Sequence, residues 1–275
     1  MNVSLIGNGY LGQAYEGVFP EALVYDEPKG MYAGEQTLEA GRMAVNACDL
    51  AIIAVPTDYK DGELDTSIVE DIVGWCESET ILIKSALQPG TTDRMVRETG
   101  KNIAVSVELI GEGKYYQPPH KYPHPTDPKQ HQMLVIGGEE PARSRAAEAL
   151  WEQMSPDIRI HLVTAIEAEI TKMAENTYGA MKVTWANVLR DVCDNYGANF
   201  IQVHQAWSED GRVDPMHTRS VAHNRGWNSK CYNKDVRAFA KASGSALLTG
   251  MIIDNDRHLA MNKENKTVGE RDPVD

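Results

Sequence analysis

The sequence begins with a short apolar run that leads into a turn with three glycines. Val3–Ile6 is followed by Gly7, Asn8, Gly9, Tyr10, Leu11 and Gly12, which places the glycines at the spacing GxGxxG. In such a turn the first glycine permits a sharp change of direction, the second lets the backbone approach a pyrophosphate, and the third lets a helix pack closely on the strand. We therefore expect a strand–turn–helix unit in which these six residues bind a dinucleotide.

The first part of the chain alternates short apolar runs with amphipathic segments. The runs that we expect to form strands are Val3–Ile6, Ala22–Tyr25, Leu50–Val55, Ile81–Ser85, Ile103–Val107, Met133–Ile136 and Ile158–Val163. The segments of helical character between them are Glu35–Val45, Ser67–Cys76, Thr92–Glu98 and Pro141–Met154. This alternation predicts an α/β fold with a Rossmann-like, doubly wound parallel sheet.

The pattern changes near Thr164, where the strand-like runs end. Ala165–Asn195 carries apolar residues at helical spacing and no proline, which predicts one long central helix in an all-helical domain. Further helices are expected at Phe200–Trp207, Lys234–Ala242 and Ala246–Leu259. The expected domains are a dinucleotide-binding domain at 1–163, a helical dimerisation and catalytic domain at 164–261, and a polar tail at 262–275. The apolar surface of the long helix favours a homodimer.

A carboxylate follows the second expected strand. Asp26 stands about 20 residues past the glycines, where it can accept hydrogen bonds from both hydroxyls of an adenosine ribose. The same charge would repel a 2′-phosphate, so NAD is favoured over NADP. The structural alternative is that Asp26 only caps the strand end. Val55, Pro56 and Thr57 end the third strand at the edge where such folds bind ligands, although a proline there commonly just ends a strand.

The bulk composition limits the partners of the chain. A formal net charge of -13 and a pI near 5.1 argue against nucleic acid, because such binders concentrate Lys and Arg. No apolar run approaches the roughly 20 residues that span a bilayer, and the first residues lack the features of a signal peptide. The four cysteines form no CxxC pair, which gives no sign of a zinc or disulfide framework. We expect a cytoplasmic protein with a small-molecule partner.

Two groups of reactive side chains lie far apart in the second half. Glu169, Lys172 and Asn176 are three and four residues apart, so they project from one face of the long helix, although most such pairs are solvated surface pairs. Cys231 is flanked by two lysines whose charges favour a thiolate. A single cysteine is more commonly a small buried hydrophobe, but the polar, glycine-containing neighbourhood argues against a core position.

The segment Tyr115–His131 contains five prolines and three histidines, and it predicts a long irregular loop. His120, His124 and His131 have spacings of four and seven residues without an accompanying cluster of carboxylates or thiols. A metal site there is therefore disfavoured against a solvated loop, and we expect no bound metal.

Taken together, these segments resemble the UDP-glucose/GDP-mannose 6-dehydrogenase family, from Met1 to about Leu259. The family's GxGYxG resembles Gly7–Gly12, its AVPTP resembles Ala54–Asp58, and its KSTxPxGTT resembles Lys84–Thr92. Its PEFLREG resembles Val107–Gly113, its AExxKxxxN resembles Ala168–Asn176, and its GGSCxPKD resembles Asn228–Asp235. The joint match is far more specific than any single motif.

The resemblance implies that two NAD oxidise the C6 alcohol of a nucleotide sugar to a uronic acid, through a thiohemiacetal and then a thioester on a cysteine. It implies that Cys231 is the nucleophile and that Lys172 with Asn176 stabilises the alkoxide or oxyanion. Asp235 would order the base or the hydrolytic water, Glu112 would lie near nicotinamide and water, and Glu108 would support that network. Lys234 would contact the substrate, and Arg212 would reach it across a dimer interface. A surface arginine is the alternative for Arg212.

The chain also departs from the family pattern. It is expected to be a shortened member that lacks the C-terminal domain for the nucleotide of the sugar substrate. Ala86 replaces the threonine of KST, and Ser85, a further cofactor candidate, could substitute for it, although neighbouring strand positions face opposite ways. Asn228 and Ser229 replace the paired glycines, and Gly111 replaces an arginine. We therefore expect the reaction type to be retained more reliably than the substrate.

Two other interpretations stay open. A two-electron dehydrogenase of a hydroxy acid or sugar acid, such as a 3-hydroxyacid or 6-phosphogluconate dehydrogenase, would share the architecture and a Lys/Asn helix pair, but Cys231 disfavours it. A non-catalytic relative that binds NAD is suggested by the expected lack of the second domain and by Ala86.

Overall fold

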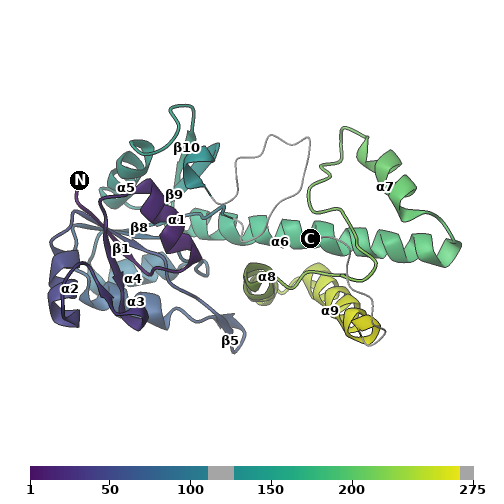
Figure 1. Cartoon of the computed structure of the whole chain (residues 1–275), viewed down its shortest axis with the longest axis horizontal. Coiled ribbons are helices and arrows are strands. Elements are labelled where there is room, and N and C mark those ends of the chain that lie inside the picture. Colours follow the sequence, from purple (N-terminus) through teal and green to yellow (C-terminus); the bar gives the residue numbers. More distant parts are fainter. Residues whose placement is uncertain (111–126, 267–275) are drawn as a thin grey trace. The chain divides into compact units, whose positions relative to one another are not determined.

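The computed structural model describes residues 1–110 and 127–266, and contacts divide the chain into two compact units. The sheet unit comprises Met1–Lys60 with Leu64–Lys172, and the helical unit comprises Asp61–Glu63 with the chain from Met173. The division falls inside the long helix, whose first part packs with the sheet. Figure 1 labels the helices α1 to α9 and several of the strands.

Eight of the described strands form one sheet in the sheet unit, with the order β10-β9-β8-β7-β4-β1-β2-β3. The strands β1 (Val3–Ile6), β2 (Leu23–Asp26), β4 (Leu50–Ile53), β7 (Thr80–Ile83) and β8 (Ile103–Ser106) are parallel. The strand β9 (Met133–Gly138) is antiparallel to β8, β10 (Arg159–Val163) is parallel to β9, and β3 (Met31–Tyr32) is an antiparallel edge. The expected α/β fold with a large parallel sheet is confirmed. The antiparallel β8–β9 pair was not expected, because an apolar run does not reveal the direction of its strand.

Helices cover both faces of this sheet. They are α1 (Tyr10–Val18), α2 (Leu38–Asn46), α3 (Ser67–Trp75), α4 (Thr91–Thr99) and α5 (Ala142–Trp151), with the 3-10 helices η1 (Glu27–Lys29) and η2 (Pro128–Gln130). Because successive strand residues face opposite sides, two cores form. Leu5 and Leu82 pack in the core that contains residues of α1 and α5, and Ile6 and Ile83 pack in the core that contains residues of α2, α3 and α4. The short strands β5 (Tyr59–Lys60) and β6 (Glu63–Leu64) pair separately.

The helical unit is built on the long helix α6 (Ala165–Tyr196), which matches the expected Ala165–Asn195 closely. Its other helices are α7 (Phe200–Ser208), α8 (Lys230–Ser243) and α9 (Ala246–Lys266). Helix α8 begins four residues before the expected start at Lys234, because Ser229 caps it: the Ser229 Oγ accepts a hydrogen bond from the Tyr232 N–H at 3.2 Å. Among the helices that the structure describes, none is long and apolar enough to cross a membrane.

The segment from Asn262, which the sequence suggested as a loose tail, begins inside α9. Asn262 is buried and its side chain is hydrogen-bonded to the backbone of Arg225. The continuation of this helix was not predicted because its buried positions Asn255, His258 and Asn262 are polar and therefore give no apolar periodicity.

Candidate active site

The glycine turn joins β1 to α1, and each glycine has a different surrounding. Gly7 has φ of +97°, and a Cβ there would overlap the carbonyl oxygen of Ala54 just after β4. A Cβ at Gly12 would overlap the carbonyl oxygen of Gly7. A Cβ at Gly9 would meet none of the described atoms within 4 Å, which leaves the open approach that a pyrophosphate needs. Gly9 is also the N-cap of α1, so the turn fits a dinucleotide at a helix N-terminus.

The Asp26 carboxylate lies beside this turn. Its Oδ2 accepts a hydrogen bond from the Asn8 N–H at 2.7 Å, and its Oδ1 accepts one from the Lys29 N–H at 3.1 Å. The second bond makes Asp26 the N-cap of η1, so the capping alternative is part of the structure. The Lys29 ammonium, which the sequence reasoning missed, contacts the backbone and side-chain oxygens of Asn8. The available signal was a lysine three residues after the aspartate that ends β2.

Two hydroxyl groups join the carboxyl ends of β4 and β7. The Ser85 Oγ donates to the Val55 carbonyl at 2.8 Å and accepts from the Val55 N–H at 3.0 Å. The Thr57 Oγ1 donates to the Ala86 carbonyl at 2.8 Å, while Pro56 between them is exposed. A hydroxyl has a single proton, so the Ser85 proton is already used by the backbone. That Ser85 takes over the role of the threonine hydroxyl lost at Ala86 stays a prediction.

Glu108 follows the end of β8 and is buried. Its Oε2 lies 3.1 Å from the Lys84 ammonium, and its Oε1 accepts hydrogen bonds from the N–H groups of Leu109 at 2.8 Å and Ile110 at 2.7 Å. Burial opposes ionisation, but the Lys84 charge, the Ile110 N–H and the nearby His131 outweigh it, so the pKa of Glu108 lies below its usual value. Glu108 is held as a carboxylate at neutral pH.

Two lysines approach Glu108 from different elements. The buried Lys84 ammonium also donates to the Ser106 Oγ at 3.0 Å and lies over the Tyr15 ring of α1, 4.8 Å from its centroid. Lys172, in the first part of α6, donates to the backbone carbonyl oxygen of Glu108. The sheet unit therefore brings Lys172 and Glu108 together, and it adds Lys84, whose contacts the sequence did not reveal.

Glu169 lies one turn before Lys172 and caps another helix. Its Oε1 accepts from the Thr92 N–H at 2.8 Å and the Thr92 hydroxyl at 2.7 Å, and its Oε2 accepts from the Gly90 N–H at 2.5 Å. These N–H groups begin α4, so the carboxylate compensates the N-terminus of that helix. Burial raises the pKa of Glu169, and the surrounding donors, which are neutral, offset this only in part.

The helical unit gathers a second group of side chains. The Asn176 Nδ2 donates to the Asp235 Oδ2 at 2.5 Å, and the Lys234 ammonium donates to the Asp235 Oδ1 at 2.8 Å. Asn176 and Asp235 are both buried. Cys231 precedes Asp235 by four residues in α8, so their side chains lie on the same face of the helix. This unit therefore brings together Asn176, Lys234 and Asp235 and places Cys231 one turn away.

Cys231 lies in the first turn of α8, whereas the helix expected from the sequence begins only at Lys234. A helix N-terminus carries partial positive charge, which favours the thiolate form. The Cys231 side chain is half-buried, whereas Cys48, Cys76 and Cys193 are buried. Burial raises the pKa of the Cys48 and Cys76 thiols. Of the four cysteines, Cys231 has the surroundings that best suit a nucleophile.

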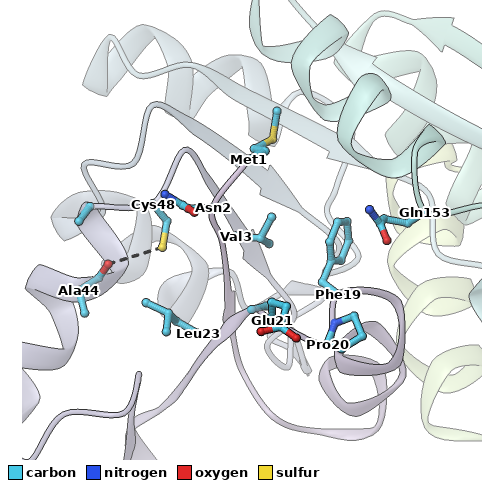
Figure 2. A pocket seen from close by; sticks show the side chains of 12 residues that line it. Met1, Asn2, Val3, Phe19, Pro20, Glu21, Leu23, Ala44, Cys48 and Gln153 are labelled. Carbon is cyan, nitrogen blue, oxygen red and sulfur yellow. Dashed lines mark hydrogen bonds between the residues drawn. The ribbon is translucent and has the colours of Figure 1, made fainter.

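A cavity of about 490 Å³ opens elsewhere in the sheet unit (Figure 2). Its lining includes Val3 and Leu23, which begin β1 and β2, whereas the glycine turn follows the end of β1. Figure 2 also shows the Cys48 thiol donating to the Ala44 carbonyl, at 3.5 Å. Within the sheet unit, the cavity lies at the end of the strands opposite to the glycine turn.

The remaining candidates are placed as follows. Arg212 is exposed and its guanidinium pairs with Asp210 at 2.5 Å, so its role across a dimer interface stays a prediction. Glu112, His120 and His124 lie outside the described residues. His131 is buried, whereas the sequence predicted that it lies in a solvated loop. Within residues 1–110 and 127–266, no group of three or more His, Cys, Asp or Glu side chains is arranged to hold a metal ion.

The comparisons with known proteins include a family model, sequence relatives and solved structures. Residues 166–260 match the model of the UDP-glucose/GDP-mannose dehydrogenase family, central domain. The chain is 28% identical over 247 residues to the UDP-glucose 6-dehydrogenase of Rhizobium meliloti (strain 1021), a match that covers 81% of this chain and 54% of that protein. The chain thus spans about half the length of the curated relatives it matches. The family resemblance inferred from the motifs is confirmed.

Two solved structures extend the comparison of the fold. A UDP-glucose dehydrogenase from Pyrobaculum islandicum superposes with a TM-score of 0.72 and 22% identity, over 93% of this chain and 68% of that one. The 3-hydroxyisobutyrate dehydrogenase of Mycobacterium tuberculosis superposes with a TM-score of 0.64 and 13% identity, over 94% of this chain and 93% of that one. At these identities the likeness concerns the fold alone.

Proposed function

We propose that this protein oxidises the C6 alcohol of a nucleotide sugar to a carboxylate, with NAD as the hydride acceptor and Cys231 as the covalent nucleophile. The observation that carries the proposal is the Cys231 thiol in the first turn of α8, one turn before the buried Asp235–Asn176 pair. The match of residues 166–260 to the family's central domain supports it, because Lys172, Asn176, Cys231 and Asp235 all lie in that range.

The proposed oxidation has two stages that share Cys231. Loss of a hydride from C6 and of the hydroxyl proton gives an aldehyde, to which the Cys231 sulfur adds to form a thiohemiacetal. Loss of a second hydride gives a thioester, and water then releases the carboxylate and restores the thiol. One alcohol, one water and two NAD give one carboxylate, two NADH and three protons. The proposal therefore predicts two NADH for each sugar.

The chain's own residues supply the charges that these stages need. The Lys172 ammonium and the Asn176 amide are donors suited to an alkoxide or oxyanion, which positioned donors stabilise strongly. Asp235 accepts hydrogen bonds from Asn176 and Lys234, and it lies one turn after Cys231 on the same face of α8. We assign the ordering of the hydrolytic water to Asp235 and Glu112, contact with the substrate to Lys234, and support of Lys172 to Glu108, whose carbonyl accepts from it.

The glycine turn and Asp26 support NAD as the cofactor. NAD would accept the hydride at nicotinamide, with its pyrophosphate beside Gly9 and its adenosine ribose beside Asp26. Val55, Pro56 and Thr57 lie at the same edge of the sheet. Replacing Asp26→Asn removes the charge that repels a 2′-phosphate, so binding of NADP relative to NAD should rise, as measured by calorimetry with both dinucleotides.

Stoichiometry tests the oxidation directly. NADH formed per sugar consumed would be measured across a panel of nucleotide sugars for the wild type, Cys231→Ser and the control Cys193→Ala, which removes a buried thiol of the same unit. We expect two NADH for the wild type and the control, and at most one for Cys231→Ser. Two NADH from Cys231→Ser would exclude the thioester route.

A two-electron dehydrogenase is the second candidate. It is favoured by the replacement of the family's threonine by Ala86, together with the hydrogen bond by which the neighbouring Ser85 hydroxyl donates its proton to the Val55 carbonyl. One NADH per substrate in the wild type, with activity retained in Cys231→Ser and lost in Lys172→Ala, would select this candidate.

Self-association is part of the proposal. Tyr178, Trp185, Val192 and Tyr196 are exposed and follow one another in α6 by seven, seven and four residues, so they form one apolar stripe. A second copy of the chain is the occupant we infer, and it would bring Arg212 toward its partner's substrate. Sedimentation that gives only monomer at micromolar concentration would remove this inference, and replacing Trp185→Lys should weaken the dimer if it forms.

A further inference from the structure

Two asparagines of α9 bind the chain segment that leads into α8. We call this segment, residues Arg225 to Trp227, the strap. The Asn262 Oδ1 accepts from the Arg225 N–H at 2.8 Å, and the Asn262 Nδ2 donates to the Arg225 carbonyl at 2.7 Å. The Asn255 Oδ1 accepts from the Trp227 N–H at 2.7 Å, and the Asn255 Nδ2 donates to the Trp227 carbonyl at 3.0 Å. Each amide therefore satisfies both polar groups of one strap residue.

The spacing of the two asparagines fits this task. They are seven residues apart, which is about two helical turns, so both project from one face of α9 toward the strap. Asn255 is 0% exposed and Asn262 is 8% exposed, so water is poorly placed to replace either amide. An aspartate of the same shape would keep the acceptor and lose the donor that the strap carbonyls need.

The middle residue of the strap must be a glycine for the same contact. Gly226 has φ of +81°, and a Cβ there would lie 2.8 Å from the Asn255 Oδ1. A side chain at this position would be strained and would also push Asn255 away from Trp227. The backbone of the strap is thus shaped for close approach to α9.

The side chains of the strap attach it to α6. The Arg225 guanidinium donates to the Asn187 Oδ1 and the Asp191 Oδ1, both at 2.6 Å. The Trp227 indole N–H donates to the Thr184 Oγ1 at 3.0 Å. The strap is therefore fixed by its backbone to α9 and by its side chains to α6, within the helical unit.

We propose that Asn255 and Asn262 are positioning residues for Cys231. Trp227 stands two residues before Ser229, the N-cap of α8, so holding the Trp227 backbone fixes where this helix begins and how the Cys231 thiol meets its N-terminus. The Trp227 ring also contacts the ring of Tyr232, with centroids 6.5 Å apart. The consequence for turnover rests on the proposed function, whereas the effect on the thiol does not.

The test uses thiol chemistry, which needs no substrate. Alkylation of Cys231 by iodoacetamide at pH 7 is followed by mass spectrometry in the wild type, Asn255→Asp and Asn262→Asp. The matched control is Asn195→Asp, which changes an exposed asparagine of the same unit. Hydrogen exchange of the strap is measured in the same proteins. We expect the strap to exchange roughly tenfold faster in the two variants, because a buried carbonyl loses its donor. Alkylation should slow by about two- to fivefold, because a frayed first turn stabilises the thiolate less.

The control should match the wild type in both measurements. Faster exchange with alkylation at or above the wild-type rate would overturn the positioning role and leave a purely structural contact. Unchanged exchange would overturn the contact itself. If Asn255→Asp does not fold, Asn262→Asp gives the same test at the less enclosed site. Absence of oxidation by the wild type would remove the proposed function without affecting either readout.

A pH signature separates the amide contact from packing. A protonated aspartate at 255 can donate to the Trp227 carbonyl again, so its pKa is raised in the fold and the stability lost in Asn255→Asp returns as pH falls. The deficit in melting temperature against the wild type should therefore shrink from pH 7.5 to pH 5. Asn255→Leu, which cannot be protonated, should keep a constant deficit, and equal behaviour of the two variants would contradict the contact.

Discussion

The two units hold a carboxylate of lowered pKa in different ways. In the sheet unit, Glu108 forms an ion pair with Lys84, and their side chains are 11% and 1% exposed. In the helical unit, Asp191 is 24% exposed and accepts from Arg225 at 2.6 Å, Arg257 at 2.8 Å and His258 at 2.9 Å. Burial opposes ionisation at both sites, yet the pKa of each carboxyl is lowered, that of Asp191 to about 2.

The two sites differ in how well the carboxylate charge is still compensated after one of its partners is removed. A charge that is sealed from water and has one partner becomes uncompensated when that partner is removed, which is costly in a region of low dielectric constant. A carboxylate that has several donors and some access to water keeps partial compensation. The number of partners and the access to water should therefore decide the cost of a substitution more than the pKa shift does.

The largest effect is expected for Lys84→Met in the sheet unit. This change keeps the side chain out to the ε position, removes the ammonium and leaves Glu108 buried with its two backbone donors and the nearby His131. The free energy of unfolding, measured in urea, should fall by about 3–5 kcal/mol. Lys84→Arg is the matched variant that keeps the charge.

The double variant Lys84→Met with Glu108→Gln sharpens the comparison. Removing both charges should recover most of the loss, because replacement of a whole buried pair is often nearly neutral. A double variant as unstable as Lys84→Met alone would show that packing of the lysine, and not the unpaired charge, sets the cost.

A smaller and pH-dependent effect is expected for Asp191→Asn in the helical unit. The pKa of Asp191 is depressed in the fold, so its stabilisation is present above its unfolded value of 3.8 and is lost as pH falls toward about 2. After allowance for solvent screening, this contribution is about 1–2 kcal/mol. Acid unfolding followed by circular dichroism should be less steep between pH 4 and pH 2 in Asp191→Asn. An unchanged slope would mean that other carboxylates control acid unfolding.

How much of the fold was predictable depends on whether a residue is buried by apolar packing or by hydrogen bonding. The expected strands and the long helix were found because apolar spacing records burial directly, as in Leu50–Ile53, which is buried throughout. The direction of β9 was not predicted, because it depends on how this strand pairs with β8. The end of α9 was missed because Asn255, His258 and Asn262 are buried by hydrogen bonding, which apolar periodicity does not register.

The candidate site was predictable in its residue types and less so in its contacts. The glycine turn and Asp26 follow from local spacing, because one strand, turn and helix create the geometry. The contacts of Lys84 and Lys29 depend on tertiary neighbours, so no local pattern marked them. Cys231 was identified, but its position in a helix was missed because Ser229 was considered only as a replaced glycine and not as an N-cap.

The smallest effect is expected for Glu169→Gln, a third carboxylate whose donors are all neutral. Because burial raises the pKa of Glu169, its contribution is fully present below the unfolded pKa and is lost as pH rises through the folded one. Glutamine keeps one acceptor for the N-terminus of α4, so the loss near neutral pH should be about 1 kcal/mol or less. Relative to Glu169→Gln, the wild type should gain stability as pH falls from 7 toward 5, opposite to the trend for Asp191.

Glu169→Ala, which leaves the N–H groups of Gly90 and Thr92 without this acceptor, should cost more at every pH. A loss for Glu169→Gln as large as that for Lys84→Met would refute the rule that a missing cation partner, and not burial alone, sets the cost.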